Sequence, residues 1–350
     1  NIIINLDTKH DALHILNKIF KFNFKIKDLK KFDKNKVVAI IGVGGSILGS
    51  QAINSFLKKK SKKIFLFFND IDKNIITKLK SKKKLNKILF IIISKSGNTI
   101  ETLSNFLILK IIKKNSQNII IISKKNNNPL HILSKKMNLH YIEHKDYIGG
   151  RYSIFSEVGM VPAYLMGVNF SRFRKNLQNP LKINKNFLKE SSIILSNLLK
   201  NNKFRNLILF NYIPELDNFL FWCQQLIAES LGKRGKGFLP VISKAPKDHH
   251  SLLQLYLDGP KDKIFYIFSE EIKGHKKEKI KTKNLDKRIN FLNNKSLDQI
   301  KEAQKSAFIK SLKNKNIPFR EFKIRDFNDD TLGELFSYFM LETAIIGKLT

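Results

Sequence analysis

Short, continuous runs of apolar residues recur along the chain, and longer stretches with helical spacing separate them. Strands that are apolar on both faces suit a parallel sheet covered on both sides. Their alternation with helices is typical of β-α-β units. The sequence therefore predicts an α/β fold with mainly parallel sheets. The expected strands are 37–43, 63–68, 87–94, 118–123 and 140–143, then 206–212, 237–242, 263–269 and 319–324.

The chain has 350 residues, which is enough for two domains with sizeable cores. Proline and polar residues near Pro180 mark the expected boundary between two α/β halves. We expect an N-terminal helical segment, a first α/β subdomain and a second one, over residues 1–30, 31–178 and 179–350.

Local patterns predict three helix features. An apolar stripe indicates a helix in the N-terminal segment, formed by Leu13, Ile15, Leu16, Ile19 and Phe20. Capping boxes predict where two later helices begin, because a Ser or Thr side chain and a Glu or Gln three residues on can bond each other's backbone N–H. These boxes are Ser296-x-x-Gln299 and Thr331-x-x-Glu334.

The net charge is +36, from 65 basic and 29 acidic residues. Such a balance raises the possibility of nucleic-acid binding. However, only eight of the basic residues are Arg, and the lysines are spread along a chain that is also rich in Ile and Asn. We therefore expect a solvated lysine surface that attracts anionic metabolites, with no specific nucleic-acid partner.

Cellular location and redox chemistry are constrained by what the sequence contains. No apolar run approaches the roughly 18 residues of a membrane helix. The first residues carry no secretory-signal pattern. Cys223 is the only cysteine, so neither an internal disulfide nor a cysteine-based zinc site is expected. These features predict a cytoplasmic protein without a membrane partner.

A glycine-rich turn follows the first expected strand, in the run Gly42-Val-Gly44-Gly45-Ser46-Ile-Leu-Gly49. Glycines at a strand-to-helix turn let backbone N–H groups approach an anion. A dinucleotide fingerprint would need glycine where Ile47 stands, although Asp70 could supply the ribose-binding acid. A tight turn with no ligand remains the alternative to an anion site.

Hydroxyl groups gather after the third expected strand, in the run Ser94-Lys-Ser-Gly-Asn-Thr-Ile-Glu-Thr102. Hydroxyls and backbone amides at a helix N-terminus form a phosphate cradle, which the helix dipole favours. The alternative is structural capping by Thr99 or Thr102. The spacing does not match a Walker A loop.

Two charged residues are candidates for stabilising an anionic oxygen and for acid–base chemistry. Arg151 follows paired glycines in the run 149–153, which suits an anionic oxygen close to the backbone. Glu229 stands near the end of a helix that Gly232 stops, where the negative dipole end disfavours the charged carboxylate. Such a group suits a base that also returns a proton. A surface arginine in a turn and an exposed helical glutamate are the alternatives.

Adjacent histidines occur in the run Lys247-Asp-His-His-Ser251, which we expect to open a helix. Neighbouring helical positions cannot place both rings on one metal, because helical metal ligands need i, i+4 spacing. One imidazole acting as an acid or base is the better interpretation.

Together these segments resemble glucose-6-phosphate isomerase (phosphoglucose isomerase) in its short bacterial form. The matching runs, in the family's order from about Val38 to Gly259, are GVGGSILG, ISKSGNTIET, GGRYSIFSEVGMVPAYLMG, QQLIAESLGK and KDHHSLLQLYLDGP. A weaker match covers 331–346. The resemblance implies two αβα-sandwich sugar-isomerase subdomains.

The resemblance also implies an activity: reversible conversion of glucose 6-phosphate to fructose 6-phosphate through a cis-enediol, in glycolysis and gluconeogenesis, without metal or nucleotide. It implies that Glu229 moves the proton and that Arg151 stabilises the enediolate. The implied phosphate and sugar contacts are Ser94, Ser96, Thr99 and Thr102, with Lys95 through its backbone, and Gly45, Ser46 and Gly150 beside the sugar.

His250, by the same resemblance, assists ring opening and reaches the site from the partner subunit of a homodimer. A bifunctional glucose/mannose phosphate isomerase and a non-catalytic sugar-phosphate-binding protein are the alternatives. The family continues beyond the last helix into a segment like Asn-Pro-Phe-Asp-Gln-Pro-Gly-Val-Glu, followed by a ring-opening lysine. Lys348 does not occupy that position, so the resemblance predicts that activity depends on this segment.

Overall fold

A computed structural model describes residues 11–350 except 59, 83, 202, 272–277 and 284. The described chain forms two compact units. Unit 1 comprises the residues up to Ser196 together with Glu215–Leu231 and Phe327–Thr350, and unit 2 comprises Asn197–Pro214 and Gly232–Asp326. The predicted limits of the two α/β subdomains, residues 31–178 and 179–350, stay a prediction.

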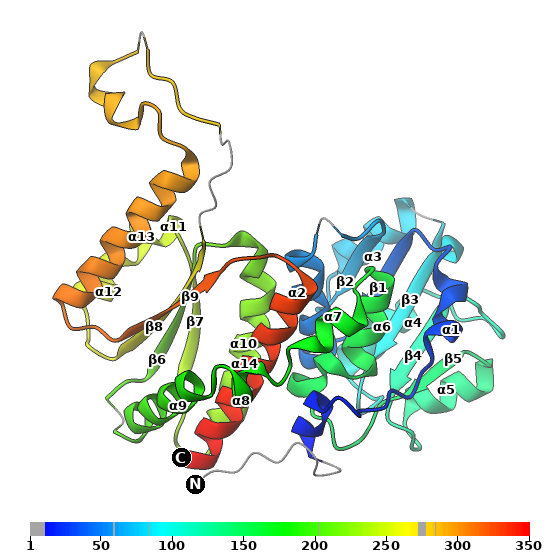
Figure 1. Ribbon diagram of the computed structural model, residues 1–350. Helices are drawn as coiled ribbons and strands as arrows, with labels where there is room; N and C mark the ends of the chain where they lie inside the picture. Colours follow the sequence, from blue (N-terminus) through cyan, green and yellow to red (C-terminus); the bar gives the residue numbers. More distant parts are fainter. Residues whose placement is uncertain (1–10, 59, 83, 202, 272–277, 284) are drawn as a thin grey trace. The chain divides into compact units, whose positions relative to one another are not determined.

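Unit 1 is built around a five-stranded sheet in the order β2-β1-β3-β4-β5, in which all neighbours are parallel (Figure 1). Isoleucine-rich runs form its centre, where every residue of β3 and β4 is buried. The strands are β1 (Val37–Ile41), β2 (Ile64–Phe68), β3 (Ile88–Ile93), β4 (Ile119–Ser123) and β5 (His140–Glu143). Each lies within a run predicted from the sequence.

Both faces of this sheet are covered. On one face Phe90, Ile92 and Ile121 pack against Phe106 and Leu130 from neighbouring helices. The alternate strand residues point to the other face and are also buried. Continuous apolar runs therefore mark strands with two dry faces, as predicted.

The helical segments of unit 1 are mostly short. Those from the first part of the chain are η1 (Ala12–Leu16), α1 (Ile26–Leu29), η2 (Lys30–Phe32), η3 (Gly44–Ser46), α2 (Leu48–Phe56), α3 (Lys73–Lys82), η4 (Leu85–Lys87), α4 (Ile100–Ile108) and α5 (Pro129–Met137). The later ones are η5 (Gly150–Phe155), α6 (Glu157–Leu165), α7 (Phe170–Lys175), α8 (Asn179–Lys182), α10 (Asp217–Leu231) and α14 (Asp329–Leu349). Segments α9 (Lys185–Lys200) and η6 (Pro214–Leu216) cross unit boundaries.

The N-terminal segment is less helical than predicted. After residue 10 only η1 and α1 are helical before Lys30, and Ile19 is 70% exposed. The Asn17 side chain accepts a hydrogen bond from the Ile19 N–H, which competes with helix continuation. Residues 1–10 of this prediction lie outside the described residues.

Helix α10 follows a strand of unit 2 in the chain, yet it packs against α2 and α14 in unit 1. Phe219 and Trp222 on α10 lie in edge-to-face contact with Phe336 of α14. One apolar face of α10 is buried, so burial holds the helix there. Among the described residues, no helix combines the length and the apolar character that a membrane span needs.

Unit 2 contains a four-stranded parallel sheet in the order β7-β6-β8-β9 (Figure 1). Phe210 and Phe265 from this sheet pack against Phe308. The elements are β6 (Asn206–Asn211), β7 (Leu239–Lys244), α11 (Lys247–Ser251), α12 (Leu253–Asp258), β8 (Lys263–Glu270), η7 (Lys287–Leu292), α13 (Leu297–Asn314) and β9 (Phe319–Ile324). Two parallel-sheet units confirm the predicted α/β fold class.

One of the two predicted capping boxes is present. The Ser296 side chain and the Gln299 side chain each accept the other's backbone N–H at the start of α13. The second predicted box, with Thr331 as the N-cap, is wrong, because α14 begins at Asp329 and already includes Thr331. Asn328 is the N-cap there, and its side chain accepts a hydrogen bond from the Thr331 N–H.

We expect Asn328→Ala to lower the free energy of unfolding by about 1 kcal/mol, because the mutation leaves an N-terminal N–H of α14 without its side-chain acceptor. Thr331→Ala, the matched control inside the same first turn, should cost less than about 0.5 kcal/mol. Urea denaturation of both variants measures the difference. Equal losses would contradict the assignment of Asn328 as the cap.

Candidate active site

The candidate site lies at the carboxyl edge of the unit 1 sheet, where β1 and β3 end side by side. Ile41 of β1 pairs with Ile92 of β3, so the glycine turn after β1 and the hydroxyl loop after β3 begin next to each other. From β1 the chain continues to β2 on one side, whereas β3, β4 and β5 lie on the other. Ligands bind at such topological switch points in open α/β sheets.

Three hydroxyl groups form a tight cluster after β3. Ser94 Oγ lies 2.8 Å from Thr99 Oγ1, and Ser96 Oγ lies 3.4 Å from each of them. Gly97 permits this turn because its φ is +70° and a Cβ there would lie 1.8 Å from Asn128 Oδ1. The loop therefore presents several hydroxyl donors at one point.

The cluster sits at the N-terminus of α4, and its hydroxyls do not cap that helix. Thr99 is the N-cap residue, but its side chain makes no capping hydrogen bond. It faces the Ser94 hydroxyl instead. The first backbone N–H groups of α4 and the positive end of its dipole are thus available to an anion. This geometry favours the phosphate interpretation over the structural-cap alternative.

Two other residues predicted in this loop lie differently. Thr102 is buried, with 1% exposure, and its Oγ1 has no hydrogen-bond partner in the structure. Lys95 directs its side chain toward Asp146, with Nζ 4.0 Å from Oδ1. Its backbone carbonyl accepts the Lys124 N–H. The structure therefore places the Lys95 backbone, and not its ammonium group, in the loop's framework.

The glycine turn after β1 meets the loop that carries Arg151. A Cβ on Gly45 would lie 2.1 Å from the carbonyl carbon of Gly150, so only glycine allows this backbone contact. Ser153 Oγ donates to the carbonyls of Gly45 and Gly150, at 3.1 and 2.7 Å. Ser46 belongs to the same turn, in η3.

Arg151 and Glu229 form an ion pair beside this contact. Arg151 Nη1 lies 2.5 Å from Glu229 Oε1, and Arg151 Nε donates to Ser230 Oγ at 2.7 Å. The Tyr152 hydroxyl lies 3.2 Å from the same Ser230 oxygen. Glu229 is half exposed, so its carboxylate is accessible to a ligand, whereas Arg151 is mostly buried. The structure thus brings together two residues that are far apart in sequence.

Sequence reasoning missed Gln225. Its Nε2 donates to Glu229 Oε2 at 3.2 Å and lies 2.9 Å from the Cβ position of Gly44. Its Oε1 is buried without a hydrogen-bond partner. The i, i+4 spacing of Gln225 and Glu229 on one helix was the available signal. Gln225 therefore links the predicted base to the glycine turn.

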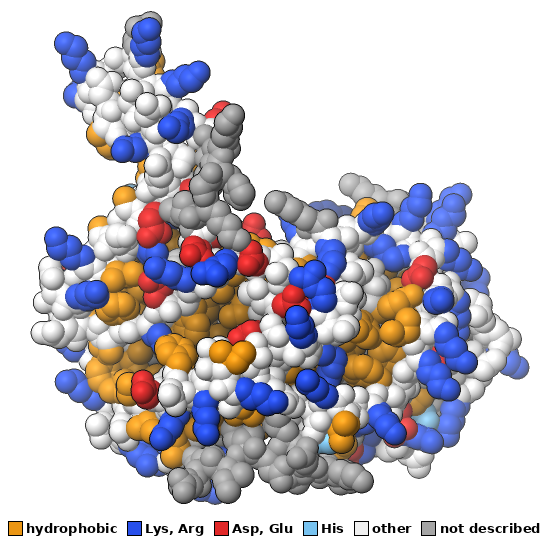
Figure 2. All heavy atoms as spheres, viewed as in Figure 1, with side chains coloured by type: hydrophobic (Ala, Val, Ile, Leu, Met, Phe, Trp, Pro, Cys, Tyr) orange, Lys and Arg blue, Asp and Glu red, His pale blue; other side chains and the backbone are white. Residues whose placement is uncertain are grey.

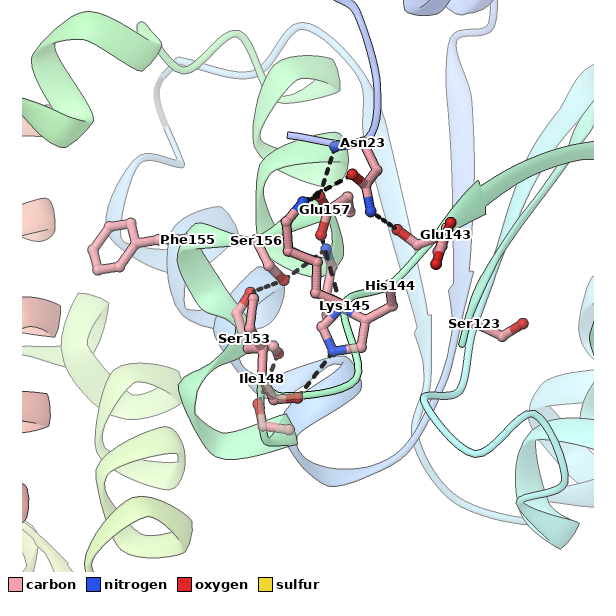
Figure 3. Close-up of polar contacts among 12 residues, drawn as sticks. Asn23, Ser123, Glu143, His144, Lys145, Ile148, Ser153, Phe155, Ser156 and Glu157 are labelled. Atoms are coloured by element: carbon pink, nitrogen blue, oxygen red, sulfur yellow. Dashed lines mark hydrogen bonds and ion pairs between the residues drawn. The ribbon is translucent and has the colours of Figure 1, made fainter. Parts of the chain in front are cut away.

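A buried polar cluster supports the Arg151 loop (Figure 3). Glu157 Oε1 accepts the Asn23 N–H at 2.8 Å and lies 3.5 Å from Lys145 Nζ, while Glu157 Oε2 lies 3.8 Å from His144 Nδ1. Burial alone raises the pKa of a carboxyl group. The His144 imidazole, the N–H groups of Asn23 and Glu157, and the Lys145 cation outweigh burial and hold the pKa of Glu157 below its usual range.

His250 belongs to unit 2, where it is exposed on α11. Its neighbours on that helix are fixed. Asp248 accepts hydrogen bonds from Ser243 Oγ and the Lys244 N–H, and its pKa lies below the usual range because these bonds outweigh its desolvation. His249 Nε2 lies 2.8 Å from the Tyr212 hydroxyl. Leu252 interrupts the predicted longer helix, and α12 begins after it.

A metal site would need a different arrangement of ligands. Within the described part of the chain, no three His, Cys, Asp or Glu side chains gather closely enough to hold an ion.

The two parallel-sheet units place the chain in the class of sugar isomerase-fold proteins, as the similarity to two solved structures shows. A hypothetical protein from Thermus thermophilus has a similar structure, with a TM-score of 0.82, 22% identity, and coverage of 93% of this chain and 82% of that one. A glucose-6-phosphate isomerase from Chlamydia trachomatis has a TM-score of 0.75 and 19% identity over 93% of this chain and 68% of its own. These likenesses show the shared fold.

The chain belongs to the phosphoglucose isomerase family, because the model of that family matches residues 14–324. It is 32% identical to a glucose-6-phosphate isomerase of Methanocaldococcus jannaschii, over 93% of this chain and 81% of the relative. A probable glucose-6-phosphate isomerase of Methanococcus maripaludis is 30% identical over 93% of this chain and 76% of the relative. A glucose-6-phosphate isomerase from Campylobacter jejuni is 29% identical over 97% of this chain and 84% of the relative.

We expect Thr99→Val to weaken the binding of a hexose phosphate by about tenfold, because one hydroxyl donor to the anion is lost. The same mutation should shift the unfolding midpoint only slightly, since Thr99 makes no capping bond and the Ser94 hydroxyl, which loses Thr99 as a partner, keeps the Gly97 N–H as a donor. Thr77→Val on exposed α3 is the matched control. Calorimetric titration checks affinity, and a loss of stability without a loss of affinity would contradict the cradle.

Proposed function

We propose that this protein interconverts glucose 6-phosphate and fructose 6-phosphate by moving a proton between C1 and C2. Family membership and the named relatives support this activity. The observation that carries it in this chain is the Arg151–Glu229 pair beside the Gly45–Gly150 backbone contact. An aldose–ketose shift needs a carboxylate base and a neighbouring cation in this relation.

The phosphate binds the hydroxyl loop. Ser94, Ser96 and Thr99 donate hydrogen bonds to its oxygens, and the N-terminus of α4 favours its charge. The buried Thr102 hydroxyl, which has no partner in the structure, adds a fourth donor, and the Lys95 backbone frames the loop. Anchoring the phosphate fixes the distance of C1 and C2 from the base.

Glu229 transfers the proton. In the open-chain aldose its carboxylate takes the proton from C2, the C1–C2 double bond forms, and the carbonyl electron pair moves to O1. The O2 proton passes to O1, and Glu229 returns its proton to C1 while the C2–O2 double bond forms, which gives the ketose. Arg151 stabilises the negative oxygen of the enediolate, while Gly45, Ser46 and Gly150 line the sugar.

His250 assists ring opening by exchanging a proton with the ring oxygen. We place it in the site of a second subunit, so that the working form is a homodimer. One feature of unit 2 supports this assembly: the segment that holds η7 projects away from the sheet (Figure 1). It exposes large apolar side chains, namely Leu285, Phe291 and Leu297, which a second copy would cover.

The location and the remaining partners follow from the same chemistry. A free, buried Cys223 and a charged metabolite as substrate fit the cytoplasm. Figure 2 shows Lys and Arg side chains scattered over the visible face with Asp and Glu among them. Such scatter supports attraction of small anions over a specific nucleic-acid surface.

We expect Glu229→Gln to lower kcat for fructose 6-phosphate by at least about 100-fold, because the amide cannot accept the C1 proton of the ketose. Glu215→Gln, an exposed carboxylate near the start of the same helical region, is the matched control. A coupled NADP-linked dehydrogenase measures glucose 6-phosphate, and deuterium from D2O should appear in the product.

Further outcomes of this assay separate the alternatives. Comparable turnover of mannose 6-phosphate would favour the bifunctional isomerase. Tight hexose phosphate binding without turnover, in a chain that carries the complete family segment after α14, would favour the non-catalytic binding protein and contradict the proposed activity.

We expect Glu229→Gln and His250→Gln homodimers to regain activity when they are unfolded together and refolded as a mixture. A mixed dimer has one site with both native residues only if His250 acts across the interface. Random pairing then restores about a quarter of wild-type activity. Each variant refolded alone is the control. Absence of complementation would contradict the shared site.

A further inference from the structure

Glu157 and His144 are buried ionisable residues that the proposed reaction does not use. Their side chains are 0% and 1% exposed. We propose that this pair positions Arg151 by closing the loop from His144 to Glu157 at its base, an inference that rests on the proposed role of Arg151. Glu157 and His144 are positioning residues here, since neither reaches the substrate.

Closure occurs at both ends of the loop (Figure 3). His144 follows β5, where its backbone N–H donates to the Ser123 carbonyl of β4. Glu157 begins α6, directly after the N-cap Ser156. The facing atoms His144 Nδ1 and Glu157 Oε2 are 3.8 Å apart. A contact across the base restricts the conformations available to the intervening chain.

The same pair connects to the residues next to Arg151. His144 Nε2 lies 3.2 Å from the carbonyl oxygen of Ile148. The imidazole thus fixes the residue directly before the glycine pair that precedes Arg151. On the helix side, Ser156 Oγ donates to the Ser153 carbonyl, and Ser153 Oγ donates to the Gly150 carbonyl. Arg151 is thus held between two anchored segments.

Further groups fix Glu157 itself. Lys145 Nζ lies between Glu157 Oε1 and Asn23 Oδ1, at 3.5 and 2.8 Å, and the Asn23 N–H donates to that same carboxylate oxygen. The helix dipole at the start of α6 also favours the carboxylate. A buried ion pair contributes little net stability but can specify one geometry. Positioning is therefore the role that this arrangement suits.

Kinetic coupling between Glu157→Gln and Arg151→Lys tests the proposal. Glutamine retains the shape of the side chain and an acceptor for the Asn23 N–H but removes the charge that faces His144 Nδ1 and pairs with Lys145. We expect Glu157→Gln to lower kcat by about tenfold with KM changed less than about twofold, since a displaced Arg151 loses contact mainly with the enediolate. In the Arg151→Lys background the same mutation should lower kcat less than about twofold, because the geometry it protects is already lost.

Controls separate positioning from plain stabilisation. Glu143→Gln removes an exposed carboxylate close to the loop and should leave kcat unchanged. Thermal unfolding should show the same loss for Glu157→Gln in both backgrounds. His144→Gln, which retains a donor for the Ile148 carbonyl, carries the same kinetic prediction if Glu157→Gln does not fold.

The outcomes that overturn the proposal are distinct. An equal loss of kcat from Glu157→Gln in both backgrounds would mean that the pair does not act through Arg151. An Arg151→Lys variant with wild-type kcat would remove the proposed role of Arg151, and the positioning role with it.

Discussion

The packing of α10 against α2 is the contact on which the candidate site depends. The chain leaves unit 1 before β6 and returns as α10, whose apolar residues are buried there. Burial of large side chains such as Phe219 and Trp222, each contributing about 2 kcal/mol or more, holds this helix in place. The helix delivers Glu229 to Arg151 and Gln225 to the glycine turn. Without that packing, Glu229, the base that we propose, would not lie beside Arg151 and the glycine turn.

Strand positions could be predicted from the sequence because a doubly covered strand leaves a local signature. Runs such as that of β3 contain no polar interruption, and the structure confirms them within two residues at each end. Helix starts were harder to predict, since two possible N-cap residues can lie within one turn of each other. The Thr331 box satisfied the pattern, but Asn328 provides an earlier acceptor and acidic residues fill the first turn after it. The N-terminal stripe is helical only over Ala12–Leu16, and the Asn17 side chain, which accepts the Ile19 N–H, competes with its continuation.

The site was predictable where its chemistry is local. The hydroxyl run after β3 and the glycine pairs occupy the loops in which they were expected, because turns and helix starts are encoded by neighbouring residues. Side-chain pairs that join distant segments have no such signature. The Glu157–His144 contact and the Ser230 support of Arg151 depend on how loops and helices pack in three dimensions. For Glu157, the signal available in the sequence is a charged residue next to a run of apolar residues, which suggests a buried charge with a partner.

The three-part composition of unit 1 has a consequence for how such a protein can change over generations. The hydroxyl loop and Arg151 come from its first stretch and Glu229 from its second, and Asn197–Pro214 of unit 2 separates the two stretches. Recombination at a point between Ser196 and Glu215 would therefore separate the hydroxyl loop and Arg151 from Glu229. Unit 1 can be inherited intact only together with the unit that interrupts it. The order of the segments in the gene thus links the inheritance of unit 1 to that of unit 2.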